Sequence, residues 1–164
     1  MLSVTDTEQS AELDPGAGEG FQEGCFRADL SGFIQQDYPL IVKIDSVGRL
    51  HDYYENNKDT YQFNQIYNEA ATMTDAVFGE KSGYDEVFFE SRFLLFVILE
   101  EGSGSVRHKV ESANSESCSL SVNITRIIPE IGTADIAVWY IVLAPEKALL
   151  NMDVKIILSE RRGP

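Results

Sequence analysis

Apolar residues gather in three runs in the second half of the chain, residues 93–99, 118–124 and 136–143. The first and third runs are apolar at nearly every position, which predicts central strands covered on both faces. In residues 118–124 polar and apolar side chains alternate, which predicts one buried face and one solvated face. Residues 153–158 predict a last strand before a charged tail, and the polar stretch 112–117 predicts a hairpin connection.

The first half of the chain predicts one strand followed by short helices. Residues 38–44 predict the strand, and Ser46 after it offers a helix N-cap. Val47, Leu50 and Tyr54 follow at the spacing of one buried helical stripe.

The next segment has two interpretations. Apolar residues recur at nearly helical intervals over residues 61–79, which indicates either one helix or a loop followed by a short helix capped by Thr72 or Thr74. Asp85 then caps a short turn rich in aromatic residues. The whole pattern predicts the α+β class, with two or three short helices followed by a mostly antiparallel β-sheet or sandwich.

The 164 residues predict one folded domain, residues 25–164, preceded by a leader, residues 1–24. The leader holds six acidic residues, no Lys or Arg, and several glycines, so it buries too little apolar surface to offset its ordering entropy. We therefore expect a flexible acidic leader or tether. No signal peptide is visible, which fits a tether whose targeting signal was trimmed off and equally fits a cytoplasmic protein with a loose terminus.

The two cysteines, Cys25 and Cys118, allow at most one intramolecular disulfide. Cys118 falls on the apolar face of a predicted strand, so a buried free thiol is expected there. The longest apolar run, residues 93–99, is far shorter than the roughly 20 residues that a membrane-spanning helix needs. No transmembrane segment is predicted.

The formal net charge of −14 narrows the classes of partner. Binding to nucleic acid needs a basic patch, and docking on an anionic membrane needs basic residues as well, so both are disfavoured. The acidic surface favours solubility, with attraction of a basic partner or of divalent cations as the alternative. His51 and His108 lack the spacing of a zinc site, so no metal and no cofactor is predicted.

Two loops are the candidate binding sites, and no catalytic residue is predicted. The first contains Gly102, Ser103, Gly104 and Ser105, which predict either a flexible hairpin turn or a loop that contacts a ligand or partner. The second covers residues 129–135 and includes Pro129, Gly132 and Asp135. Loops on a rigid sheet commonly carry binding contacts.

His108 and Trp139 have structural interpretations. Alternation puts His108 on the same face as Val106 and Val110, which predicts a packed and hydrogen-bonded core histidine. Trp139 lies inside an apolar run and is expected to anchor the core. Ser103, His108 and Asp135 could be imagined as a catalytic triad, but the sequence lacks a nucleophile elbow.

Several short motifs occur in a characteristic order. Phe88 and Phe89 precede the strand at 93–99, then come the Gly-Ser-Gly turn at 102–104, Pro129 with Gly132, and a strand with Trp139 that closes on Pro145 and Lys147. In this order residues 44–147 resemble the C-terminal domain of PrcB-type protease-complex subunits. The matching positions are structural: Phe88, Phe89, Gly102, Gly104, Pro129, Gly132 and Trp139. The chain departs from the family pattern at Ser103, where a second glycine is common, and at Ala144.

The resemblance implies a bacterial, exported, often lipoprotein-like domain that assists a cell-surface protease without catalysing a reaction. We therefore expect a non-enzymatic, extracytoplasmic protein, with a lipid tether upstream, that binds another protein such as a surface protease through residues 102–105 and 129–135. The alternative is a module for small ligands or carbohydrates with Tyr53, Tyr54, Tyr61 and Tyr67 lining a cleft. A hydrolase is the third hypothesis.

Overall fold

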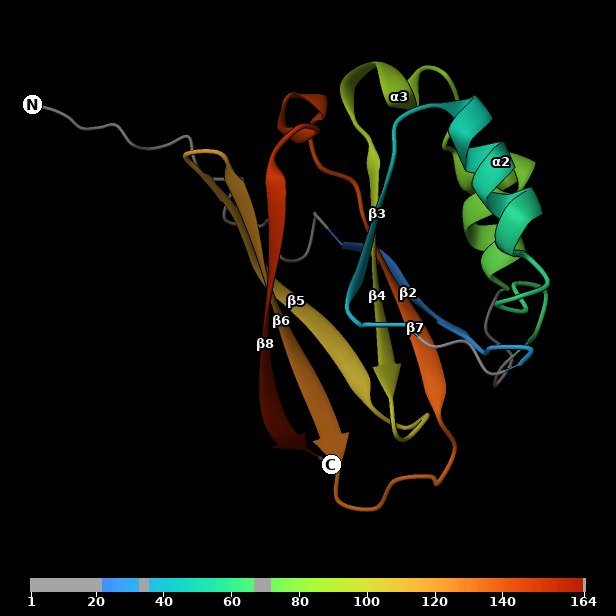
Figure 1. The fold of residues 1–164 in the computed structure, drawn as a ribbon, viewed down its shortest axis with the longest axis vertical. Coiled ribbons are helices and arrows are strands. Elements are labelled where there is room, and N and C mark those ends of the chain that lie inside the picture. The colour runs from blue at the N-terminus through green and yellow to red at the C-terminus, as the bar shows by residue number, and fades with distance from the viewer. Residues whose placement is uncertain (1–21, 33–35, 67–71, 164) are drawn as a thin grey trace, which may run out of the picture.

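The protein is built in three layers, with a four-stranded sheet in the middle, helices on one of its faces and a three-stranded sheet on the other (Figure 1). The computed structural model describes residues 22–32, 36–66 and 72–163. The strands are β2 (Gln22–Ala28), β3 (Leu40–Ile44), β4 (Leu94–Glu101), β5 (Arg107–Glu116), β6 (Ser119–Pro129), β7 (Ala137–Leu143) and β8 (Asp153–Gly163). The helices and helical turns are α2 (Val47–Asn57), η1 (Thr74–Phe78), η2 (Glu80–Ser82), α3 (Phe88–Ser91) and η3 (Lys147–Leu149). A mainly β protein with some helices agrees with the predicted α+β class.

The middle sheet has the strand order β2-β7-β4-β3 and is antiparallel throughout. Its two central strands, β4 and β7, are almost wholly buried because both faces of the sheet are covered. The prediction of doubly covered strands at 93–99 and 136–143 is therefore confirmed. β2 is a strand that the sequence pattern did not indicate.

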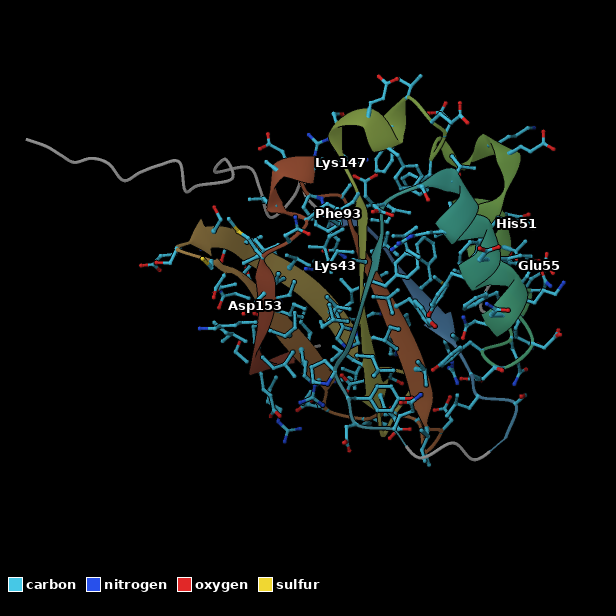
Figure 2. The ribbon with its side chains drawn as sticks, turned by 45° about the horizontal axis from the view of Figure 1, so that its top comes forward. Lys43, His51, Glu55, Phe93, Lys147 and Asp153 are labelled. Atoms are coloured by element: carbon cyan, nitrogen blue, oxygen red, sulfur yellow. The ribbon has the colours of Figure 1, made fainter. Side chains whose placement is uncertain are left out.

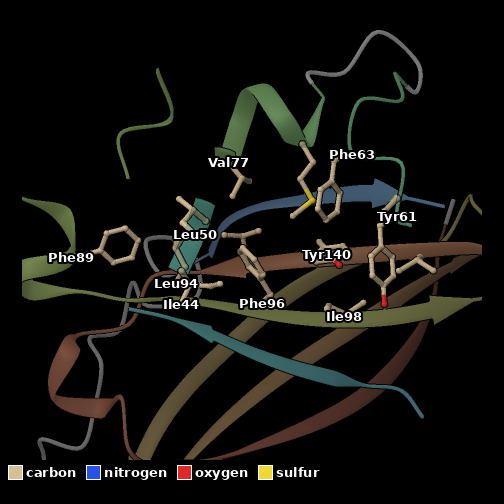
Figure 3. Close-up of a cluster of buried hydrophobic side chains, with 14 residues drawn as sticks. Ile44, Leu50, Tyr61, Phe63, Val77, Phe89, Leu94, Phe96, Ile98 and Tyr140 are labelled. Atoms are coloured by element: carbon tan, nitrogen blue, oxygen red, sulfur yellow. The ribbon is translucent and has the colours of Figure 1, made fainter. Parts of the chain in front are cut away.

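Alternation along β4 divides the apolar residues between two cores. Leu95, Val97 and Leu99 face the three-stranded sheet and pack with residues of β5, β6 and β7. Leu94, Phe96 and Ile98 face the helices. Figure 3 shows this second core, in which the aromatic rings of Phe63 and Phe96 each meet the ring of Tyr140 at an edge-to-face angle.

The helical layer forms largely as predicted. The Ser46 side chain accepts a hydrogen bond from the backbone N–H of Arg49 at 3.1 Å and starts α2. In the ambiguous segment, a loop is followed by the short helical turn η1, and Thr72 Oγ1 accepts from the N–H of Asp75. The loop interpretation is thus confirmed for the described residues, whereas Tyr67 lies outside them. The Asp85 side chain accepts from the N–H of Phe88, which confirms the predicted turn cap.

The three-stranded sheet has the order β5-β6-β8. β5 and β6 form an antiparallel hairpin, while β8 runs parallel to β6 over all eleven of its residues. The predicted hairpin is present, but the predicted bounds 112–117 of its connection are wrong, because Ser112 to Glu116 continue β5 and the turn lies at Ser117 and Cys118. Ser117 adopts a positive φ of 57° there.

Three further predictions from the sequence differ from the structure. Cys118 is exposed rather than buried, because it lies in the turn before β6 begins, and both cysteines are free thiols. Residues 102–105 connect strands of two different sheets, so they are not a hairpin turn. β2 begins at Gln22, inside the range 1–24 assigned to the leader, and residues 1–21 lie outside the described residues.

Helices of the described residues are all too short or too polar to cross a lipid bilayer.

Candidate functional site

A groove of about 620 Å³ separates α2 from the segment that runs from η1 to the start of α3. Its lining comes from two stretches of chain: Val47, Leu50, His51 and Tyr54 on α2, and Phe78, Gly79, Glu80, Ser82, Tyr84, Asp85, Glu86 and Val87 on the opposite wall. The volume falls in the range of about 300–1,000 Å³ that is typical of ligand pockets. Figure 2 shows His51 on the side of α2 that points away from the sheets.

The wall of the groove is apolar and aromatic. The rings of Tyr54 and Phe78 lie 5.0 Å apart at a tilted angle. Val87 is 70% exposed and Val47 is 38% exposed, so two aliphatic side chains face solvent beside these rings. Exposed aliphatic groups next to aromatic rings supply the contact area from which an apolar ligand group gains affinity.

The rim of the groove is acidic. Glu80, Asp85 and Glu86 are exposed, and within the described residues none of these carboxylates takes part in an ion pair. The surrounding residues 45–66 and 72–90 contain nine carboxylates against three Lys or Arg side chains. This side of the protein therefore carries an electrostatic potential that attracts cations.

Two glycines allow tight backbone turns in the wall opposite α2. At Gly79 a Cβ atom would lie 3.1 Å from the carbonyl oxygen of Asp75, so a side chain there would press on the preceding turn. Gly83 adopts a φ of 89°, which favours glycine. The two glycines therefore permit the backbone course of the segment between η1 and α3, which forms this wall of the groove.

The two loops predicted to bind a partner, residues 102–105 and 129–135, are hydrogen-bonded to each other, and these hydrogen bonds form the loop clasp. Ser103 Oγ and Ser105 Oγ both accept hydrogen bonds from the backbone N–H of Thr133, at 2.9 Å and 3.2 Å. The N–H of Gly104 donates to Asp135 Oδ1 at 3.2 Å. These contacts use donors and acceptors that a ligand would otherwise engage.

Asp135 is the centre of this clasp. Arg27 on β2 donates from Nη2 to Asp135 Oδ2 at 2.7 Å. Hydrogen bonds from the side chains of Thr133 and Arg27 and from the Gly104 amide hold the pKa of the Asp135 carboxyl well below its usual range. A Cβ atom on Gly104 would clash with Arg27 Nη1 and Asp135 Oδ2, so a larger residue there would force these two side chains to shift.

Gly132 lies next to the clasp, whereas Pro129 and Gly102 lie outside it. A Cβ atom at Gly132 would lie 2.9 Å from Ser103 Oγ, so the glycine allows the loops to approach. Pro129 ends β6, and nothing lies within 4 Å of a Cβ atom built at Gly102.

A buried polar network lies between the two sheets at the end of β4. The Glu101 side chain is 1% exposed and accepts hydrogen bonds from His108 Nε2 at 2.7 Å and from Arg126 Nε at 2.9 Å and Nη2 at 2.5 Å. Arg126 also pairs with Glu160 of β8 at 2.6 Å. Burial alone would raise the pKa of the Glu101 carboxyl, but the hydrogen bonds from Arg126 and His108 outweigh it and lower the pKa to about 2.

His108 is packed and hydrogen-bonded, as its position between Val106 and Val110 predicted. Its other ring nitrogen, Nδ1, lies 3.9 Å from the sulfur of Cys25. A thiol, an imidazole and a carboxylate thus stand in a row. Burial raises the pKa of the Cys25 thiol to about 12, which keeps it protonated and a poor nucleophile at neutral pH.

The other predicted constellations are not assembled. Among the described residues, no hydrogen bond joins His108 to Ser103 or Asp135, so these three do not form a triad. Tyr61 is buried, and the Tyr53 hydroxyl is hydrogen-bonded to that of Tyr140 inside the helical core. Of the tyrosines expected to line a cleft, Tyr54 does line the groove. No group of three His, Cys, Asp or Glu side chains in the described ranges could hold a metal ion.

Neither the groove nor the Glu101 network was predicted from the sequence. Glu101 continues the β4 face that carries Leu95, Val97 and Leu99, so alternation could have placed it in the core. No local signal could have revealed the groove, because its walls are about thirty residues apart in the chain and meet only through tertiary packing.

Comparison with protein-family models, with curated proteins and with solved structures gave no match. The resemblance to PrcB-type protease-complex subunits therefore stays a prediction.

Proposed function

We propose that this protein is a non-catalytic binding domain whose groove between α2 and the η1–α3 segment holds a segment of a partner protein. The segment would place an aliphatic side chain against Tyr54 and Phe78 and a basic side chain at the acidic rim. The observation that carries the proposal is the pairing of an open apolar wall with carboxylates that have no ion-pair partner among the described residues.

Charge complementarity selects the chemistry of the partner. Glu80, Asp85 and Glu86 would attract Lys or Arg and repel acidic peptides. Long basic side chains also lay their methylene stems along aromatic rings, and a cation over a Tyr face gains further energy. Lys58 already lies over the ring of Tyr54, with its Nζ atom 5.4 Å from the ring centre.

The groove is favoured over the loops at 102–105 and 129–135 as the main binding surface. The hydroxyl and amide groups of those loops bond to each other, so a partner would have to compete with the clasp. A partner that binds in the groove does not have to displace these loop hydrogen bonds.

A small amphipathic cation is the second candidate ligand. The volume of the groove suits a small molecule, and the polar residues Ser82 and Tyr84 are part of its wall. The predicted carbohydrate module would instead need several tyrosines in one cleft, whereas Tyr53 and Tyr61 pack in the core.

Calorimetric titration with short synthetic peptides tests the proposal. The panel keeps one aliphatic residue constant and varies its neighbour among Arg, Lys, Gln and Glu. We expect the Arg and Lys peptides to bind, the Glu peptide to show no heat, and added salt to weaken binding because it screens exposed charges.

Two charge-reversal variants make the test specific. Glu86→Lys on the rim should weaken binding of the basic peptides by about tenfold, on the order of 1.4 kcal/mol. Asp52→Lys, the matched control, reverses an exposed charge on α2 that does not line the groove and should change affinity little. Equal losses in both variants would show a non-specific charge effect and contradict the proposal.

The association with a surface protease and the extracytoplasmic location form a separate prediction. Both rest on the resemblance described above, and neither is needed for the groove to bind a basic segment.

A further inference from the structure

β8 is a long edge strand with large apolar side chains exposed to solvent. β8 pairs with β6 along its whole length, and among the described strands none pairs with its other edge. Two large apolar side chains stand out on it, with Ile157 49% exposed and Leu158 42% exposed. A long edge strand with exposed apolar residues is a template for pairing with another strand.

The faces of β8 follow from its packing. Val154 and Ile156 pack against the core between the sheets, so the odd-numbered residues face outward. Asp153, Ile157 and Arg161 therefore lie on the same outer face, and all three are exposed.

The sequence of β8 is complementary to itself in one antiparallel register. When two copies of β8 pair symmetrically, the two-fold axis is perpendicular to the sheet. It passes between one residue and the same residue of the second copy, which lie opposite each other. If that residue is Ile157, Asp153 lies opposite Arg161 on the outer face and Ile156 lies opposite Leu158 on the inner face. One pair of opposite charges and the apolar residues 156–158 then face each other across the interface, while Val154 lies opposite Glu160.

Neighbouring registers lack this match. An axis at Lys155 would bring two lysines together, and an axis at Leu158 would set Lys155 against Arg161. An axis at Ser159 would set Ile157 against Arg161. An axis at Ile156 would pair apolar residues on the inner face but set Lys155 against Ile157. Among these registers only the one centred on Ile157 pairs opposite charges.

We propose that β8 pairs antiparallel with the β8 strand of a second copy of this chain, in the register centred on Ile157, to give a symmetric dimer with one continuous sheet across the interface. The occupant of the edge is a second copy because Asp153 and Arg161, and the apolar residues 156–158, complement each other across a two-fold axis at Ile157.

Dimer formation through β8 leaves the groove accessible. Figure 1 shows α2 and β8 on opposite sides of the middle sheet, and Figure 2 labels Asp153 and His51 on these two sides. A dimer would carry two grooves, so a partner with two basic segments would bind with higher avidity. The dimer itself does not depend on the proposed function of the groove.

Sedimentation equilibrium of the full chain over a range of concentrations tests the proposal. We expect a mass that rises from 18.3 kDa toward twice that value. Asp153→Arg or Arg161→Asp should each weaken the dimer about tenfold or more, and the double variant should restore it because the two charges exchange places. Asp52→Arg on α2 is the matched control and should dimerise normally.

Three outcomes would overturn the proposal. The first is a monomer at every concentration up to about 1 mM, where even a millimolar interface would be half formed. The second is a dimer that the single charge reversals leave intact. The third is a double variant that stays as weak as the single variants while circular dichroism shows all of them folded.

Discussion

Glu101→Gln should lower the free energy of unfolding by about 3 kcal/mol at pH 7, more than any substitution on the exposed surface. The substitution keeps the size of the side chain but removes the charge that His108 and Arg126 bind. Its amide NH₂ group would face donors of these two residues, which leaves hydrogen bonds unmade in a buried site.

The value of about 3 kcal/mol follows from the pKa shift of Glu101 and also from the typical cost of breaking a buried ion pair. The pKa of Glu101 falls from 4.5 to about 2 on folding, and at about 1.4 kcal/mol per pKa unit the shift corresponds to roughly 3 kcal/mol. The side chain is 1% exposed, so water does little to screen it. Removing one partner of a buried ion pair typically costs about 3–5 kcal/mol.

The pH dependence separates this effect from general destabilisation. Because folding lowers the pKa of Glu101, its stabilisation is complete above the unfolded-state pKa and is lost as the pH falls from about 4.5 toward about 2. Urea unfolding followed by tryptophan fluorescence at several pH values should therefore show the largest difference between wild type and variant at pH 7. The two curves should converge in acid.

Glu100→Gln is the matched control, because Glu100 is the exposed neighbour on the same strand. It should change the free energy of unfolding by less than about 0.5 kcal/mol, as surface substitutions usually do. A loss below about 1 kcal/mol for Glu101→Gln, or a difference from wild type that stays constant from pH 7 to pH 2, would refute the reasoning about the network.

Two further predictions concern the cysteines and the loop clasp. Iodoacetamide should label the exposed Cys118 rapidly in the native protein and the partly buried Cys25 much more slowly, because the raised pKa keeps the Cys25 thiol protonated. Mass spectrometry after peptide cleavage measures both sites, and equal native labelling would contradict this difference in reactivity. Asp135→Asn should weaken the bonds from Arg27 and the Gly104 amide and speed hydrogen exchange at Gly104, whereas unchanged protection there would show that the clasp does not depend on the Asp135 charge.

Local patterns in the sequence predict the parts of the fold that depend on alternation. The apolar run at 93–99 indicated a strand covered on both faces, and the faces of His108 and Val110 followed from period two. The helix that starts after Ser46 followed from its cap and its stripe of apolar residues.

Other features could not be predicted because they depend on distant contacts. β8 continues through charged residues to Gly163, since an edge strand with solvent beside it tolerates Glu160 and Arg161. Tyr61 and Phe63 are buried in a turn in which Gln62 has a φ of 53°, so their helical spacing was misleading.

The candidate site was the least predictable part of the structure. The loops at 102–105 and 129–135 were singled out from their glycines and serines, and the structure does bring them together. Sequence could not show that they satisfy each other's hydrogen bonds. Nor could it show that Tyr54 faces a groove while Tyr53, its neighbour, packs into the core.

Chemical-shift mapping by NMR with an Arg-containing aliphatic peptide tests the central claim most directly. We predict that backbone amide shifts change at Val47, His51, Gly79 and Val87, which line both walls of the groove, while those of the loop residues Ser103 and Thr133 stay fixed. Shifts confined to the loops, or no shifts at peptide concentrations up to about 1 mM, would contradict the assignment of the groove as the binding site.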